Sequence, residues 1–314
     1  MTFKFFDKLS QDFSELLNDK KEHNVVIEVD KEENMKSFTA HSVVLRYRSS
    51  YFDKELENAT TNKNNIKTII KPNISAKIFE IILKLVLMDL QHHVHDFSEL
   101  LNDKKEHNVV IEVDKEENMK SFTAHSVVLR YRSSYFDKEL ENATTNKNNI
   151  KTIIKPNISA KIFEIILKYI YGGIVNIENT DTKTIYELMV NASKLEVKEL
   201  SIKLEIYLIE SKASWLRTHF SLVYRLIFDG NDFEDLKNFY NDIIVKYPNL
   251  IFESEDFTSL QETALISILK RDDLKVKEIK IWDYVIKWVF AFLLLILLRK
   301  RMDDCWVDNK ILSK

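Results

Sequence analysis

The chain has 314 residues, a net charge of −3 and an isoelectric point near 6.3, so no overall basic field favours nucleic acid. Apolar residues make up 45% of the sequence, which is enough for two or three ordinary domains, and the three glycines do not form a phosphate-binding loop. The single cysteine, Cys305, excludes an internal disulfide framework and is typical of a reducing compartment.

One long stretch of the sequence occurs twice, because residues 12–84 recur unchanged as residues 96–168. A unit of this length is a domain, since solenoid repeats span roughly 20–50 residues. The second copy continues through Gly172-Gly173, whereas the first copy runs directly into the second. We therefore expect the first copy to be incomplete.

The two copies predict the same order of elements. Ahead of them, apolar residues at three- and four-residue spacing predict an amphipathic helix that contains Phe3, Phe6, Leu9, Phe13, Leu16 and Leu17. In the first copy, β-branched residues predict strands at 25–29, 37–41 and 66–71, with one or two short helices between the second and third strands. Ser75 is an expected N-cap for the helix that follows.

Only the second copy continues further. Gly172-Gly173 ends its helix, residues 174–177 form a short strand, and Asp181 or Thr182 caps another helix. Residues 197–210 predict one more helix, and from Ser214 onward every pattern is helical. The sequence thus predicts an α+β part followed by an all-helical part.

The motifs of the second copy resemble the BTB/POZ fold, and the helical part resembles the BACK domain that follows it in many adaptor proteins. The BTB-like motifs are Phe122-x-Ala124-His125-x-x-Val128-Leu129, Ser134-Tyr135-Phe136 and Ile170-Tyr171-Gly172-Gly173. The BACK-like segment runs from Ile268 to Trp288. We expect a partial BTB copy over 1–95, a BTB/POZ domain over 96–211, a BACK-like domain over 212–298 and a polar tail over 299–314.

The resemblance implies association. BTB domains typically homodimerise through the N-terminal helix, which places Phe3, Phe6, Phe13, Phe97, Leu100 and Leu101 at a dimer interface. Many BTB–BACK proteins bind the third cullin through one helix of the BTB domain. In this chain Tyr135, Phe136 and Leu140 lie where that helix is expected to begin, so the resemblance implies them as partner-binding residues. Core packing is the competing interpretation for Phe136. The two copies in one chain also suggest pairing within the chain, because a linked partner is present at high effective concentration.

The sequence departs from two patterns of the family. An apolar–any–acidic motif usually follows the cullin-facing helix, whereas residues 140–147 read Leu-Glu-Asn-Ala-Thr-Thr-Asn-Lys. BTB transcription factors often carry an acidic residue before the first strand and a basic one after Ala-His. Here those positions are Asn108 and Ser126, which argues against a co-repressor role.

No catalytic, cofactor-binding or metal-binding set is predicted. The sequence His92-His93-x-His95 offers three histidines in one short segment, whereas zinc usually takes about four ligands from two separated pairs. His41 and His125 precede helices and are expected to be structural, since neither has a matched nucleophile nearby in the sequence.

The apolar run 289–298 is too short to span a membrane, which takes roughly 20 residues, so we expect a buried helix. The leading hypothesis is a non-enzymatic, self-associating adaptor that recruits an unknown substrate protein to a cullin-RING ubiquitin ligase, in the cytoplasm or the nucleus. The alternatives are an oligomerisation scaffold that does not bind cullin, and a membrane-tethered interaction protein that uses the apolar run.

Overall fold

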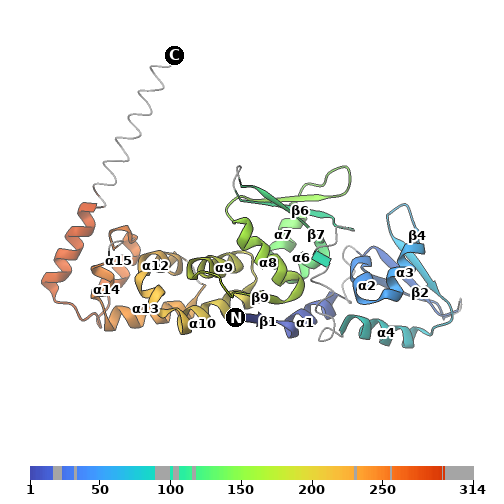
Figure 1. Cartoon of the computed structure of the whole chain (residues 1–314), viewed down its shortest axis with the longest axis horizontal. Helices are drawn as coiled ribbons and strands as arrows, with labels where there is room; N and C mark the ends of the chain where they lie inside the picture. The colour runs from blue at the N-terminus through green and yellow to red at the C-terminus, as the bar shows by residue number, and fades with distance from the viewer. Residues whose placement is uncertain are drawn as a thin grey trace, which may run out of the picture. The chain divides into compact units, whose positions relative to one another are not determined.

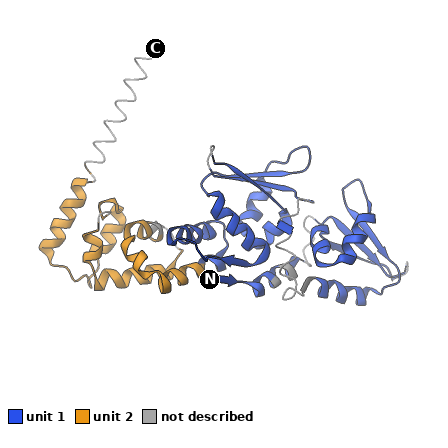
Figure 2. Cartoon of the chain, in the orientation of Figure 1, with its two compact units in different colours: residues 1–201 blue, residues 202–314 orange. Residues whose placement is uncertain are grey.

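The computed structural model describes residues 1–16, 23–31, 34–88, 100–101, 106–114, 118–229, 232–254, 257–291 and 293. These residues fall into two compact units, Met1–Ser201 and Ile202–Lys314 (Figure 2). Within the first unit we call residues 12–88 repeat one and residues 96–201 repeat two.

Both repeats contain the predicted hairpin, paired helices and third strand (Figure 1). The elements up to the end of repeat one are β1 (Thr2–Lys4), α1 (Phe6–Leu16), β2 (Val25–Val29), β3 (Lys36–Ala40), α2 (Ser42–Arg48), α3 (Ser50–Asn58), β4 (Thr60–Thr61), β5 (Lys67–Lys71) and α4 (Ala76–Met88). In the sheet, β2 pairs antiparallel with β3 and parallel with β5, in the order β3-β2-β5-β4.

Repeat two has the same pairings in the order β7-β6-β8. Its elements are β6 (Val109–Val113), β7 (Lys120–Ala124), α6 (Ser126–Arg132), α7 (Ser134–Asn142), β8 (Lys151–Lys155), α8 (Ala160–Gly172), β9 (Ile174–Asn176), α9 (Thr182–Lys194) and the start of α10 (Lys198–Ser211). The alternation of buried and half-buried residues along β6 places Val109, Ile111 and Val113 in the core.

Local sequence sets the ends of the helices in repeat two. Ser159 caps α8 by accepting a hydrogen bond from the amide of Ile162, and Asp181 caps α9 in the same way with Thr184. Gly173 ends α8 in the left-handed conformation, at φ 61°. These ends agree with those predicted from the sequence.

One prediction for the N-terminus differs from the structure. Residues 2–4 form a strand, and the amphipathic helix begins only at Phe6. Strand β1 pairs antiparallel with β9, with Phe3 opposite Val175, so the start of the chain adds to the end of repeat two. Phe3 is buried by this pairing.

In the second unit the described residues form helices joined by turns and irregular segments. It contains the remainder of α10, α11 (Ala213–Thr218), α12 (Phe220–Asp229), α13 (Glu234–Lys246), α14 (Asn249–Phe252), a short 3₁₀ turn at Phe257–Ser259, α15 (Glu262–Leu269) and a last helix over 278–291. Tyr240, Phe252 and Phe257 are among its fully buried side chains.

Candidate functional site

The N-terminal segment completes repeat two. The backbone amide of Phe5 donates to the carbonyl of Gly173 at 2.8 Å, and the carbonyl of Met1 accepts from Ile177 at 3.0 Å. The ring of Phe5 meets that of Tyr169 edge-on, with centroids 5.1 Å apart. A β-carbon on Gly173 would lie only 3.3 Å from the Phe5 carbonyl oxygen, so this close approach suits glycine.

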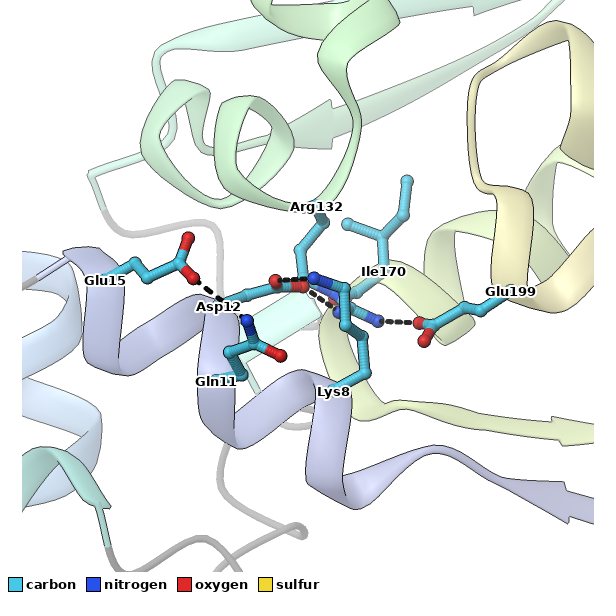
Figure 3. Close-up of polar contacts among 7 residues, drawn as sticks. All are labelled: Lys8, Gln11, Asp12, Glu15, Arg132, Ile170 and Glu199. Atoms are coloured by element: carbon cyan, nitrogen blue, oxygen red, sulfur yellow. Dashed lines mark hydrogen bonds and ion pairs between the residues drawn. The ribbon is translucent and has the colours of Figure 1, made fainter.

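Arg132 lies at the centre of the contact between α1 and repeat two (Figure 3). Its side chain is 1% exposed and forms an ion pair with Asp12 of α1, whose side chain is 6% exposed. The guanidinium also donates to the carbonyl of Ile170 at 3.1 Å and lies 4.9 Å from the centre of the Tyr169 ring. A planar, multidentate cation suits such a site, because it satisfies several acceptors at once.

Two further charged residues border this buried pair. Lys8 approaches Asp12 at 2.6 Å, and Glu199 approaches Arg132 at 3.4 Å. Burial raises the pKa of Glu199 above its ordinary value, and it outweighs the opposing charge of Arg132. The surroundings of Arg132 therefore disfavour ionisation of this carboxyl, as expected where water is largely excluded.

The same arginine in repeat one has different surroundings. Arg48, the sequence counterpart of Arg132, is half-buried and donates to the carbonyl of Val86 at 2.9 Å. Its counterpart contact in repeat two is the one to Ile170, so the link to the last turn of the helix is common to both repeats. The ion pair with Asp12 arises because α1 contacts α6.

A second polar cluster joins the two repeats. Glu106, just before β6, accepts from the hydroxyl of Ser42 and forms ion pairs with Lys67 at 3.0 Å and Arg46 at 3.2 Å. Burial alone would raise the pKa of Glu106, but these hydrogen bonds and positive charges outweigh it and hold the pKa below its ordinary value. The cluster therefore favours the ionised carboxylate and links repeat two to repeat one.

The pair Asn108 and Ser126 forms a neutral hydrogen-bonded unit. The Asn108 amide donates to the Ser126 hydroxyl, and its oxygen accepts from the Ser126 backbone amide, each at 2.8 Å. Asn24 and Ser42 do the same in repeat one. A neutral hydrogen-bonded pair thus occupies the position where the co-repressor pattern would place charges.

The residues predicted to contact a cullin lie on α7. Phe136 and Leu140 are fully buried in the core of repeat two, whereas the ring of Tyr135 is half-buried and lies 4.5 Å from the Lys155 ammonium. Beside them, Glu196 accepts from Ser134 and from Lys138, the latter at 3.1 Å, and so ties the turn before α10 to α7. Tyr135 is therefore the accessible residue of the predicted three.

The residues predicted at a dimer interface are distributed over the start of both repeats. Phe3 and Leu100 are buried, while Phe6 and Leu101 are half-buried. The side chain of Phe13 and the whole of Phe97 lie outside the described residues. Phe3 packs against repeat two of its own chain through the β1–β9 pairing.

The described histidines of the repeats show no arrangement for catalysis. The backbone amide of His125 donates to the Tyr171 hydroxyl at 2.8 Å, and its ring nitrogen Nδ1 lies 3.0 Å from the same oxygen. Burial raises the pKa of Tyr171, so this hydroxyl stays protonated and serves the fold. Over the described residues no group of three or more metal-binding side chains comes together, and His92, His93 and His95 lie outside them.

The helical unit has its own internal polar contacts. Glu205 accepts from the backbone amide of Leu236 at 2.8 Å and thereby caps the first turn of α13. The indole of Trp288 donates to the carbonyl of Leu260 at 2.9 Å, which fixes the last helix at that point. In the part of the chain that the structure describes, no helix is long and apolar enough to cross a membrane.

A doubled α+β unit followed by a helical unit is the architecture that defines the class of this protein. Comparison with known families agrees with this class. The BTB/POZ domain model matches residues 13–87 and 97–212, and the model called BTB And C-terminal Kelch, or BACK, matches 225–291. The BTB match covers more than half of the chain, so the chain belongs to the BTB/POZ domain family and carries a BACK domain after its second BTB region.

Several curated proteins are similar to this chain. Kelch repeat and BTB domain-containing protein 8 of Xenopus tropicalis is 26% identical over 182 residues, which is 58% of this chain and 28% of that protein. Human Kelch-like protein 41 is 25% identical over 192 residues, covering 61% of this chain and 30% of its own length. Trishanku of Dictyostelium discoideum is 25% identical over 204 residues, which is 61% of this chain and 28% of that protein. The chain thus spans less than a third of each relative.

Among solved structures, the BTB domain of zebrafish PATZ1 aligns with 38% of this chain and 91% of its own, at 23% identity and a TM-score of 0.31. The BTB domain of human gigaxonin aligns with 37% of this chain and 90% of its own, at 20% identity and a TM-score of 0.30. The expected fold class, an α+β BTB fold that is partly duplicated and followed by a helical BACK region, is confirmed by the family matches. Proteins of this family generally act by binding other proteins.

Sequence reasoning did not single out Asp12, Arg132 or Glu106. Asp12 is the first residue of the repeated sequence and lies on an otherwise apolar helix face, which was the one available signal. Asp12 of repeat one pairs with Arg132 of repeat two, and Glu106 of repeat two pairs with Lys67 of repeat one. These contacts depend on how the two repeats pack against each other. The sequence of a single repeat carries no such information.

Proposed function

We propose that the chain is a non-enzymatic adaptor that recruits a cullin-RING ubiquitin ligase through repeat two. The BTB–BACK order, shared with Kelch-like relatives, is the observation that carries the proposal. The resemblance to BTB–BACK adaptors implies the third cullin as the partner. The lone cysteine and this partner both fit the cytoplasm, with the nucleus as the alternative.

Repeat two is the better candidate for this contact. The turn that precedes α10 is joined to α7, the helix that carries Tyr135, through Glu196, Ser134 and Lys138. Tyr51, the counterpart of Tyr135, is 50% exposed in repeat one, where no counterpart of α9 or α10 follows in the sequence. A cullin that contacts both α7 and the turn before α10 would therefore bind at Tyr135.

Pairing of the two repeats within one chain forms the second part of the proposal. BTB domains self-associate, and here α1 contacts both α4 and α6 while Glu106 bridges to Ser42 and Lys67. A linked partner is present at an effective concentration in the millimolar range, which favours internal pairing over a second chain. The intact chain is then expected to be monomeric at this interface, with a mass of 37.2 kDa.

Binding to the N-terminal half of the third cullin tests the proposal. We expect the purified intact chain to bind and Tyr135→Ala to weaken binding about tenfold or more, as for a central aromatic anchor. Tyr51→Ala is the matched control, since the local sequence is identical, and it should leave the affinity unchanged.

Two results would contradict the ligase proposal. A folded chain that binds no cullin would support a scaffold that associates without a ligase, with the missing acidic motif as the reason. Equal losses of affinity from Tyr135→Ala and Tyr51→Ala would show that the contact is not specific to α7 of repeat two.

A further inference from the structure

Helices α4 and α8 begin with the same nine residues but differ in what covers them. Phe79 and its counterpart Phe163 are both buried against their own sheets. On the outer face, Ile78 is 56% exposed and its counterpart Ile162 only 3% exposed. The outer face of α4 consists of Ile78, Ile81, Ile82 and Leu85, which are 56%, 58%, 37% and 63% exposed.

In repeat two part of the corresponding face packs against α9. Helix α9 contacts α8 and buries a stripe at positions i, i+3, i+4 and i+7, made of Ile185, Leu188, Met189 and Ala192. On α8, Ile162 and Ile166 are 3% exposed or less, and Tyr169, the counterpart of Leu85, is 1% exposed where it packs against Phe5 and Arg132. The repeated sequence therefore builds a helix face that holds an amphipathic helix, and repeat two shows that helix in place.

Charge accompanies this contact at the start of α9. The hydrogen bonds from Thr184 chiefly lower the pKa of Asp181, and the positive charge of Lys161 on α8 contributes to the same shift. The counterpart of Lys161 in repeat one is Lys77. On α4 the single carboxylate, Glu80, is already engaged by Lys36 at 3.4 Å and Lys84 at 3.0 Å. The exposed apolar face thus has a basic border.

Among the described residues, repeat one has no helix after α4 that corresponds to α9. Only seven residues separate the end of α4 at Met88 from the start of the second copy at Asp96, whereas α9 has 13 residues. Moving α9 to α4, in the same chain or from a second copy, would uncover α8 and leave the number of exposed faces unchanged.

We propose that the outer face of α4 is a docking site for an amphipathic helix of another protein, with apolar residues at i, i+3, i+4 and i+7 and an acidic residue at its N-terminus. Exposed apolar patches with polar borders are typical of such helix-in-groove contacts. The basic border favours this acidic helix over a second copy of α4, which carries the same lysines. The inference uses no residue of the cullin contact and is independent of that proposal.

A labelled synthetic peptide with the sequence of residues 179–197, which includes α9, is the probe. Its fluorescence anisotropy with the intact chain should show saturable binding. Ile78→Glu should weaken that binding about tenfold or more, because it places a charge in an apolar contact. Leu85→Glu, at the other end of the face, should have the same effect.

Ile70→Glu is the matched control, because Ile70 is 63% exposed on β5 of the same repeat but lies outside the α4 face. This variant should bind the peptide as tightly as the unmodified chain. A peptide with Asp181→Lys should bind more weakly. Circular dichroism and the melting temperature establish that each protein variant is folded.

Three results would overturn the inference. The first is no saturable binding of the peptide to the folded chain. The second is binding that Ile78→Glu and Leu85→Glu leave unchanged, which would mean that the peptide enters repeat two in place of α9. The third is a dimer of the intact chain that Ile78→Glu dissociates, since the face would then be occupied by a second copy.

Discussion

Removing the carboxylate of Asp12 tests whether α1 stabilises repeat two. In Asp12→Ala the Arg132 guanidinium, with a 1% exposed side chain, loses its buried anionic partner. Breaking a buried ion pair from one side typically costs about 3–5 kcal/mol, because the remaining charge is left uncompensated. Glu199 remains 3.4 Å from the guanidinium, so we expect a loss near the lower limit, about 3 kcal/mol.

Urea unfolding of the intact chain measures this loss. For a unit of this size, a loss of about 3 kcal/mol lowers the midpoint by roughly 1 M. Asp53→Ala is the control, since Asp53 pairs with Arg46 at 2.6 Å but is 44% exposed, and such a pair contributes about 1 kcal/mol or less. A double-mutant cycle with Arg132→Met isolates the coupling between the two residues. Equal midpoints for Asp12→Ala and Asp53→Ala would refute the docking of α1 on repeat two.

Two carboxyl groups with opposite pKa shifts give opposite pH dependences. Burial raises the pKa of Glu205, so its contribution to stability is present below the unfolded pKa of about 4.3 and is lost as pH rises through the folded pKa. Glu205→Gln, which keeps an acceptor for Leu236, should therefore be more stable than the unmodified chain in thermal melts at pH 7 but not at pH 4. For Glu106, the hydrogen bonds and positive charges of its partners lower the pKa. The contribution of Glu106 to stability is therefore present above its unfolded pKa and is lost as pH falls through the folded pKa. Glu106→Gln should be less stable by about 1 kcal/mol at pH 7, with the difference vanishing in acid; a constant difference across pH would contradict the ion pairs with Lys67 and Arg46.

Local signals in the sequence predicted most elements of each repeat, although β4 (Thr60–Thr61) was not among them. The run Val25-Val-Ile-Glu-Val29 predicts a half-buried strand, and β2 has these bounds. The caps at Ser159, Asp181 and Gly173 follow from side chains and backbone conformations that act within a few residues. Such features depend on neighbours in the chain, so a single sequence contains them.

Contacts between distant segments could not be predicted in this way. Phe3 fits the three- and four-residue spacing of the helix that follows, but β1 forms because β9 pairs with it from the far end of repeat two. Asp12 and Arg132 are separated by 120 residues of the sequence. The clearest case is Ile78 and Ile162, which have the same neighbours in sequence and differ in exposure because only repeat two continues into α9.

The mass of the complex with the N-terminal half of the third cullin tests the central proposal most directly. Light scattering after size-exclusion chromatography gives both partner binding and stoichiometry. Pairing of the repeats within the chain predicts one 37.2 kDa chain with one cullin fragment. A complex of two chains with two fragments would contradict internal pairing, and separate elution of the folded chain and the fragment would contradict the recruitment of a cullin ligase.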